Sequence, residues 1–198
     1  MGNQVIVCIG REHGSMGRKI AMELGKKRNI SVYDKEIFST LAEEHNLDEV
    51  YLNQYDEKPQ NPLLTKVINS KSSSLEDVLA EKVFKYERSL VNKGDSFIVV
   101  GRCADYILKD YPNAIKIFIS GDSDTKIKNL SEAENIDKRE AEREILNIDK
   151  SRKFYHDHYC NTRWGDPNTY DLMVNSSILG IEGSVEVISG YIDYMLNK

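Results

Sequence analysis

The chain has 198 residues, of which 40% are hydrophobic and 30% charged, and its net charge is −5. This length suits one α/β domain with small inserts, and the negative charge argues against a general nucleic-acid or anionic-membrane surface. We expect a cytoplasmic protein, because the sequence shows no apolar signal segment and no membrane-spanning run, and its three cysteines are too widely spaced for a disulfide framework.

The first predicted unit is a strand, a glycine-rich turn and a helix in direct succession. Residues 5–9 (VIVCI) are an unbroken apolar run, typical of a central parallel strand that is covered by helices on both faces. The turn holds Gly10, Gly14 and Gly17 and opens into an amphipathic helix. Inward N–H groups and the positive helix end make an anion cradle, so we expect a phosphate ligand. An ordinary glycine turn is the alternative interpretation.

This turn departs from the P-loop pattern G-x-x-x-x-G-K-[ST], whose lysine contacts the outer phosphates and whose hydroxyl binds magnesium. Aligned on that pattern, Arg11 stands at the first glycine, Gly17 at the lysine and Arg18 at the hydroxyl position. The cations Arg18 and Lys19 could take over charge neutralisation. Ser15 is the hydroxyl in the turn that could bind magnesium instead.

A second strand is predicted at residues 30–33, followed by Asp34. Asp34 either caps the next helix or faces a ligand cleft, because ligands of such sheets bind at the carboxyl ends of the strands. A helix is predicted over 35–45. Residues 46–74 contain helix-breaking prolines and have the size of a mobile lobe that closes over a second substrate, although a surface excursion without a binding role is the alternative. A long amphipathic helix then runs from 74 to 92.

A third strand, residues 97–100, ends at Arg102, whose planar fork suits a phosphate clamp; a surface arginine that caps a loop is the alternative. Residues 114–119 form the fourth predicted strand, 170–174 the fifth and 181–196 a closing helix.

Two helices are predicted between the last two strands, one ending near Asn135 and one beginning at Asp137. The second carries a basic cluster at 149–153, which suits a lid over a triphosphate, although ion-paired surface helices look similar. The neighbouring histidines and cysteine of 156–160 lack the spacing of a zinc site, so we expect no metal ligands there.

Four stretches together resemble the cytidylate kinase-like proteins: residues 9–21, YDKE at 33–36, GRCADYIL at 101–108, and the tail at 149–175 with RWGDPNTYDLMVN. The resemblance implies a P-loop NTPase three-layer sandwich with a parallel five-stranded sheet, of the nucleoside-monophosphate-kinase type. It implies one domain over 1–198, with a core of 1–35, 93–136 and 167–198. A substrate-binding helical insertion would occupy 36–92 and a lid 137–166.

The implied activity is transfer of the ATP γ-phosphoryl group to a nucleoside monophosphate, with CMP or dCMP favoured and Mg²⁺ as the metal. The partners expected are small nucleotides, with no nucleic acid and no membrane, and homo-oligomers are compatible with the sequence. A non-catalytic nucleotide-binding regulator is the alternative, as is a kinase of another small phosphorylated metabolite, because the loop lysine and hydroxyl are replaced.

The resemblance also implies residue roles. ATP would be bound by Arg11, Glu12, His13, Gly14, Ser15, Met16, Gly17, Arg18 and Lys19. The transferring group would be stabilised by Arg18, Lys19, Lys150 and Arg152, and the acceptor held by Asp34, Arg102, Asp105 and Arg163. Asn175, Ser176 and Ser177 would lie near the adenine. The sequence departs from the family pattern at Cys103, where an aspartate is usual.

Overall fold

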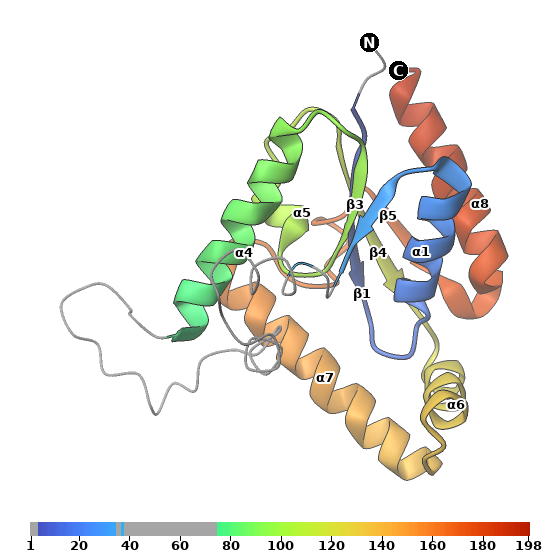
Figure 1. Cartoon of the computed structure of the whole chain (residues 1–198). Coiled ribbons are helices and arrows are strands. Elements are labelled where there is room, and N and C mark those ends of the chain that lie inside the picture. Colours follow the sequence, from blue (N-terminus) through green and yellow to red (C-terminus); the bar gives the residue numbers. More distant parts are fainter. Residues whose placement is uncertain (1–3, 35–36, 38–74) are drawn as a thin grey trace.

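The computed structural model describes residues 4–34, 37 and 75–198. Its strands are β1 (Ile6–Arg11), β2 (Ser31–Tyr33), β3 (Phe97–Val100), β4 (Ala114–Ser120) and β5 (Leu172–Asn175). They form one parallel sheet in the order β2-β3-β1-β4-β5, which confirms the predicted five-stranded α/β core (Figure 1). The predicted helix over 35–45 and the lobe at 46–74 lie outside the described residues, except Ile37.

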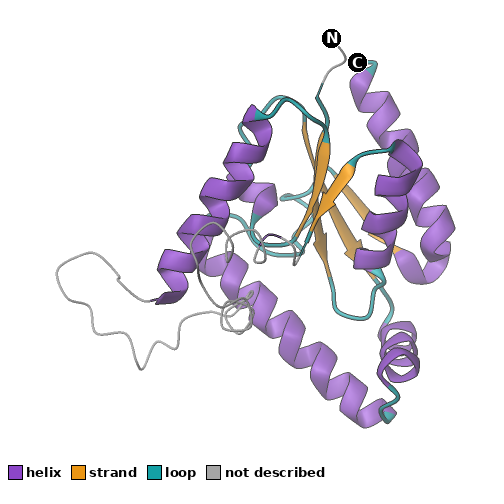
Figure 2. Cartoon of the chain, viewed as in Figure 1, coloured by secondary structure: helices purple, strands orange, loops and turns teal. Residues whose placement is uncertain are grey.

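The helices are α1 (Gly17–Arg28), α4 (Leu75–Asn92), α5 (Ala104–Ile107), α6 (Ser123–Glu134), α7 (Lys138–Tyr159) and α8 (Ser176–Leu196). In Figure 2 they lie on both sides of the strands, with α1 and α8 together on one side and α4 on the other. Helix α7 runs along the end of the sheet at which β1 passes into the glycine-rich turn (Figure 1).

Side chains of the central strand β1 alternate between two buried cores. Ile6 and Cys8 pack in the core beneath α4, whereas Val7 and Ile9 pack in the core beneath α1 and α8. Each such side chain contributes roughly 1.5–3 kcal/mol by leaving water. Because both faces of β1 are covered, its position is rigidly defined, and the turn that follows it is presented from a fixed base.

The first strand and the last helix differ from the sequence predictions in their boundaries. β1 continues to Arg11, so Gly10 belongs to the strand rather than the turn; a Cβ at Gly10 would lie 2.8 Å from the Phe118 ring and 3.0 Å from the Tyr170 hydroxyl. Close packing therefore requires this glycine. Helix α8 begins at Ser176 instead of residue 181, and it is interrupted at Gly180, which has a φ of 65° and a ψ of −171°.

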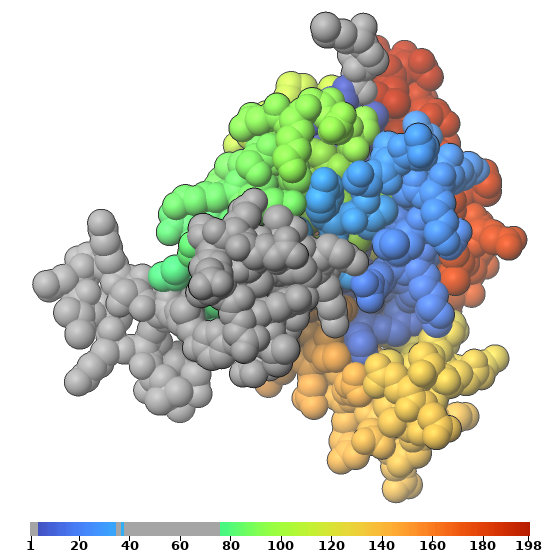
Figure 3. All heavy atoms as spheres, viewed as in Figure 1, coloured from blue at the N-terminus to red at the C-terminus, as the bar shows by residue number. Residues whose placement is uncertain are grey.

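The basic segment predicted as a lid is a continuous helix, α7, of 22 residues. Its first turn is capped by Asp137, whose side chain accepts hydrogen bonds from the backbone N–H groups of Arg139 and Glu140. Figure 3 shows α6, in yellow, as a projection from the body beside α1. Within residues 4–34, 37 and 75–198, no helix combines the length and apolar character that crossing a membrane requires.

Candidate functional site

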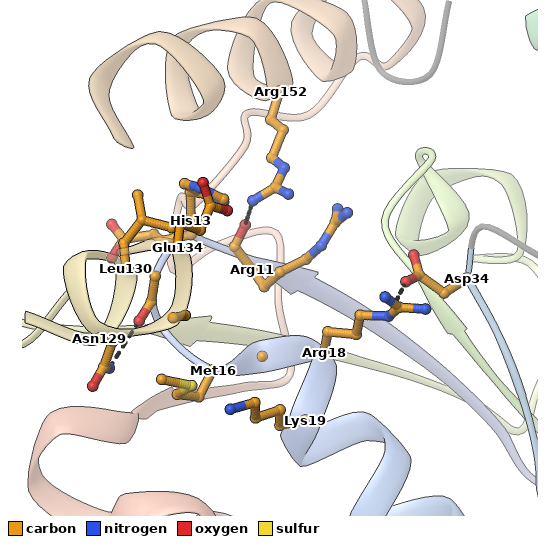
Figure 4. Close-up of a pocket in the computed structure, with 14 residues that line it drawn as sticks. Arg11, His13, Met16, Arg18, Lys19, Asp34, Asn129, Leu130, Glu134 and Arg152 are labelled. Atoms are coloured by element: carbon orange, nitrogen blue, oxygen red, sulfur yellow. Dashed lines mark hydrogen bonds and ion pairs between the residues drawn. The ribbon is translucent and has the colours of Figure 1, made fainter. Parts of the chain in front are cut away.

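A cavity of about 360 Å³ opens beside the turn between β1 and α1, and we call it the loop pocket (Figure 4). Its lining comes from the end of β1, the turn that follows it, the first turn of α1, the residue after β2, α6 and α7. The lining residues are Arg11, Glu12, His13, Gly14, Met16, Gly17, Arg18, Lys19, Asp34, Asn129, Leu130, Ala133, Glu134 and Arg152. Eight of the nine predicted ATP-binding residues are therefore in one wall; Ser15 is the exception.

The N-terminus of α1 faces this pocket without a side-chain cap from the described residues. Met16 occupies the N-cap position in the left-handed conformation, with a φ of 61°, and no acidic residue lies in the first turn. Gly14, two residues earlier, also has a positive φ of 77°. The first N–H groups of a helix lack partners within the helix and carry its positive dipole end. This end of α1 is thus suited to bind an anion such as phosphate.

Ser15 does not line the loop pocket. It donates a hydrogen bond to the Glu12 carbonyl at 2.8 Å, and the side chain is almost completely buried. On the other side, the Ser176 hydroxyl donates to the Ser15 carbonyl at 2.7 Å. Ser15 therefore holds the shape of the turn and fastens it to α8, and its contact with ATP or magnesium stays a prediction.

The position of the usual P-loop lysine is filled by Gly17 because Arg11 occupies the space beside it. A Cβ at Gly17 would lie 2.6 Å from the Arg11 Cβ, closer than real Cβ contacts allow. A side chain at residue 17 would have to displace the strand end that carries Arg11. The chain's departure from the P-loop pattern is therefore a packing requirement of this loop.

Introducing lysine by Gly17→Lys should consequently weaken ATP binding at least about 10-fold and lower the unfolding temperature, because the clash distorts the cradle. Calorimetric titration of ATP and thermal unfolding measure the two effects. Gly190→Lys in α8 is the matched control, since a Cβ there meets no heavy atom within 4 Å. Tighter ATP binding in Gly17→Lys would show that the loop accepts a standard lysine.

Four cationic side chains line the pocket: Arg11, Arg18, Lys19 and Arg152. Arg152 reaches it from α7 and donates to the Arg11 carbonyl at 3.3 Å, whereas Lys19 lies beside Met16 at the start of α1 (Figure 4). The positive potential is reflected in His13: burial, and next the charge of Arg152, lower the pKa of this histidine to about 4. His13 is thus neutral at pH 7 and adds no charge of its own to the pocket.

Asp34 links the loop pocket to the end of β3. Its carboxylate is 2.7 Å from the Arg18 Nε and 3.3 Å from an amino nitrogen of Arg102. Arg102 is buried, and it also donates to the Val100 carbonyl at 3.1 Å. Asp34 therefore orients two guanidinium groups, one in the pocket and one beneath it.

Arg102 and Asp105 line a second, much smaller cavity of about 10 Å³, which also has Arg11 and Arg152 in its lining. Asp105 is 2.8 Å from the His156 Nε2 within the core. The two predicted acceptor-binding residues thus lie together, adjacent to the loop pocket but outside its lining.

Three other predicted groups lie elsewhere. Lys150 and Arg163 are exposed, and neither lines the loop pocket. Asn175, expected near adenine with the two serines after it, caps α8 by accepting from the Ser177 N–H, and the Ser177 hydroxyl accepts from the Asp122 N–H. These side chains connect β5, α6 and α8, so they stabilise the junction of these three elements.

Two groups of residues that contribute to the site were not predicted from the sequence. Asp149 accepts a hydrogen bond from the His13 backbone N–H at 2.6 Å and so attaches α7 to the loop. From α6, Asn129 donates to the Gly14 carbonyl at 3.0 Å, and Leu130 lies beside it in the pocket wall (Figure 4). Only the basic cluster at 149–153 pointed to α7, and no motif pointed to α6.

Similar proteins were found for nearly the whole chain. A family model described as the cytidylate kinase-like family matches residues 6–178. Cytidylate kinases from Pyrobaculum islandicum and Methanocaldococcus jannaschii are each 24% identical to the chain, over 95% and 96% of its length and 92% and 98% of theirs.

Among solved structures, an uncharacterized protein from Eubacterium ventriosum is 34% identical, with a TM-score of 0.76, and the match covers 96% of this chain and 99% of that one. A shikimate kinase from Bacteroides thetaiotaomicron shares the fold at 13% identity, with a TM-score of 0.57 and coverage of 96% and 98%.

The family match includes the strand–loop–helix unit that forms the pocket, the residues of α6 and α7 that complete it, and the turn after β3 that carries Arg102. It agrees with the resemblance noted in the sequence. The chain belongs to the cytidylate kinase-like family.

Proposed function

We propose that this protein is a phosphotransferase that moves the γ-phosphoryl group of ATP to a nucleoside monophosphate, with CMP or dCMP favoured. The observation that carries the proposal is the convergence of an uncapped helix N-terminus and four cations on one pocket. Such a pocket matches a triphosphate, because backbone N–H groups and guanidinium groups are the usual phosphate donors in proteins. Family membership and the two cytidylate kinase relatives support the nucleotide acceptor.

In this proposal magnesium arrives with ATP and is held mainly by phosphate oxygens, as is usual for Mg²⁺ at phosphoryl-transfer sites. The pocket's side chains agree with that arrangement. The Ser15 hydroxyl is engaged with the Glu12 carbonyl, the Glu12 carboxylate is 3.0 Å from the Lys126 Nζ, and Asp34 is paired with Arg18. Bound magnesium would neutralise phosphate charge.

Catalysis in this site would come from positioning and charge neutralisation, which dominate phosphoryl transfer. The α1 N-terminus and Lys19 would bind the phosphates of ATP, and Arg152 would approach the transferring group from α7. An oxygen of the acceptor's phosphate is already anionic, so it attacks in line without a general base. Arg18, oriented by Asp34, would hold the γ-phosphate of ATP and the phosphate of the acceptor next to each other.

The test is ADP release, coupled to an indicator reaction, with ATP, Mg²⁺ and each of CMP, dCMP, UMP and AMP, run beside a titration of ATP alone. Turnover with CMP or dCMP above the other acceptors is the expected result. If ATP binds but none of the four is phosphorylated, the proposal that the acceptor is a nucleoside monophosphate is wrong.

The alternative is a nucleotide-binding regulator, and the observation favouring it is Gly17 at the lysine position. A regulator would bind ATP with the same cradle and would show no phosphoryl transfer to any small acceptor. Positional exchange of ¹⁸O between the bridging and non-bridging phosphate oxygens of ATP, with CMP present, separates the two because only an enzyme catalyses it.

ATP binding should raise the pKa of His13. In the free protein Arg152 helps to hold this pKa at about 4, and a bound polyphosphate would compensate that positive charge, so the protonated ring becomes less unfavourable. NMR titration of the histidine ring signals with and without ATP measures the change. The ring of His158, exposed at the far end of α7, is the control. An unchanged His13 titration in the ATP-saturated protein would place the phosphates elsewhere.

A further inference from the structure

Three side chains of metal-ligating types, from distant parts of the sequence, meet at one side of the loop pocket. His13 lies in the turn after β1, Glu134 is the last residue of α6, and Glu144 lies in α7. One ligand atom from each, a ring nitrogen or a carboxylate oxygen, lies within 4.8 Å of the other two. His13 and Glu134 also line the loop pocket (Figure 4). We call these three residues the His–Glu cluster.

The contact between His13 and Glu144 has the spacing of two ligands on one metal ion. The His13 Nε2 is 3.3 Å from the Glu144 Oε1. Two ligands of a tetrahedral zinc ion, with bonds of about 2.0–2.1 Å, are roughly 3.3 Å apart. The Nε2 atom is buried, and it makes no hydrogen bond within the described part of the chain. A buried ring nitrogen in this position needs a partner, and a cation between it and the carboxylate would supply one.

Glu134 adds negative charge at a helix end that is already negative. The C-terminal end of a helix carries the negative end of its dipole, and the last turn of α6 has no basic residue. Because Glu134 is exposed, its side chain can rotate toward the other two ligands. A cation bound here would compensate two carboxylates and the end of α6 together.

The cationic side chains nearby are paired with carboxylates outside the cluster. The Lys126 Nζ is 3.0 Å from a Glu12 carboxylate oxygen, and an amino nitrogen of Arg152 is 3.9 Å from an Asp149 carboxylate oxygen. These pairs reduce the repulsion that Lys126 and Arg152 would exert on a bound metal ion.

We propose that His13, Glu134 and Glu144 are a binding site for a divalent first-row transition metal, with Zn²⁺ as the ion of best fit. One imidazole nitrogen and two carboxylate oxygens form a mixed ligand set that suits such metals, whereas Mg²⁺ prefers oxygen ligands and keeps most of its water. Three protein ligands leave a position open for water or another ligand, as in zinc sites with three protein ligands.

The metal would join three segments of the chain. It would fasten α6, through Glu134, and α7, through Glu144, to the turn that forms the phosphate cradle. Because an ion that binds only the folded state stabilises it, Zn²⁺ should raise the unfolding temperature of the protein. Metal binding in this site requires neither nucleotide nor phosphoryl transfer. A titration without ATP therefore tests it separately from the function proposed above.

The experiment titrates Zn²⁺ into the full-length protein, freed of metal with EDTA and without nucleotide, and follows binding by calorimetry. We expect one Zn²⁺ per chain, and Mg²⁺ at the same concentrations should not displace it. Co²⁺ in the same site gives a visible spectrum that reports its ligands. Nitrogen and oxygen ligands should produce no sulfur-to-cobalt charge-transfer band, which separates this site from binding at the three free cysteines.

Single variants assign the ligands. Glu134→Gln and Glu144→Gln each remove one negative charge with little change in size, and each should weaken Zn²⁺ binding at least about 10-fold. Glu142→Gln is the matched control, because Glu142 is exposed in α7, two residues from Glu144 and outside the cluster. It should bind Zn²⁺ within about twofold of the wild type. Circular dichroism confirms that each variant is folded.

Three results would overturn the proposal. The first is a wild type that binds no Zn²⁺, and the second is a sulfur-to-cobalt band in its Co²⁺ spectrum. The third is Zn²⁺ binding by Glu144→Gln that equals binding by the wild type.

Discussion

Arg152→Ala should lower kcat for phosphoryl transfer by about 100- to 1,000-fold, the usual cost of removing one preorganised transition-state donor. Arg152 is the cation that α7 contributes to the loop pocket, and its hydrogen bond to the Arg11 carbonyl places it over the end of β1. An arginine at this position stabilises the charge distribution of the transition state more than that of bound ATP, so kcat should fall more than the affinity for ATP. Steady-state kinetics with a saturating acceptor measure this split.

The matched control is Arg143→Ala, which removes an exposed arginine from the same helix away from the pocket. It should leave kcat within about twofold, since an exposed charge at a distance is screened by solvent. If Arg143→Ala and Arg152→Ala reduced kcat equally, α7 would act through its general charge rather than through a positioned donor.

The second large effect is expected from Asp34→Asn, which should reduce the free energy of unfolding by about 3 kcal/mol, the lower end of the cost of breaking a buried ion pair. Arg102 is almost completely buried, and the substitution takes away the carboxylate next to its charge. The contact with Arg18 contributes less, because Arg18 is half-exposed and its charge is solvated. Urea unfolding followed by circular dichroism gives the value.

Glu23→Gln provides the comparison for Asp34→Asn, because Glu23 pairs with Lys26 on the exposed face of α1. Its effect should stay below about 0.5 kcal/mol. A loss below about 1 kcal/mol in Asp34→Asn would show that the Arg102 charge is compensated by other groups, and that Asp34 is not the main support of this corner of the site.

The fold was predictable because its strands are distinct in the sequence. β3 was predicted with the correct bounds, since an apolar run of four residues lies between a glycine-containing turn and Gly101. The end of β1 was not, because Gly10 and Arg11 have the composition of a turn, yet Arg11 pairs in register with Ile119 of β4. Pairing with a neighbouring strand overrides local preference, and composition does not record it.

The candidate site was predictable on the side formed by one continuous segment. Glycines and cations after a buried strand indicated the cradle, and eight of its residues line the loop pocket. The opposite side depends on tertiary packing. Asn129 and Leu130 reach the pocket because α6 folds back beside the turn, and Ser15 stays out of the lining, its hydroxyl hydrogen-bonded to the Glu12 carbonyl. Neither orientation has a signature in the sequence.

Calorimetric titration of ATP and Mg²⁺ into the wild type and Gly14→Ala tests the account most directly. Gly14 has a φ of 77°, and a Cβ there would lie 2.8 Å from the Lys126 carbonyl oxygen, so alanine must shift the loop from α6. The account predicts one ATP per wild-type chain and binding at least about 10-fold weaker in the folded variant. No ATP binding to the wild type, or equal binding by both proteins, would contradict the loop pocket as the phosphate site.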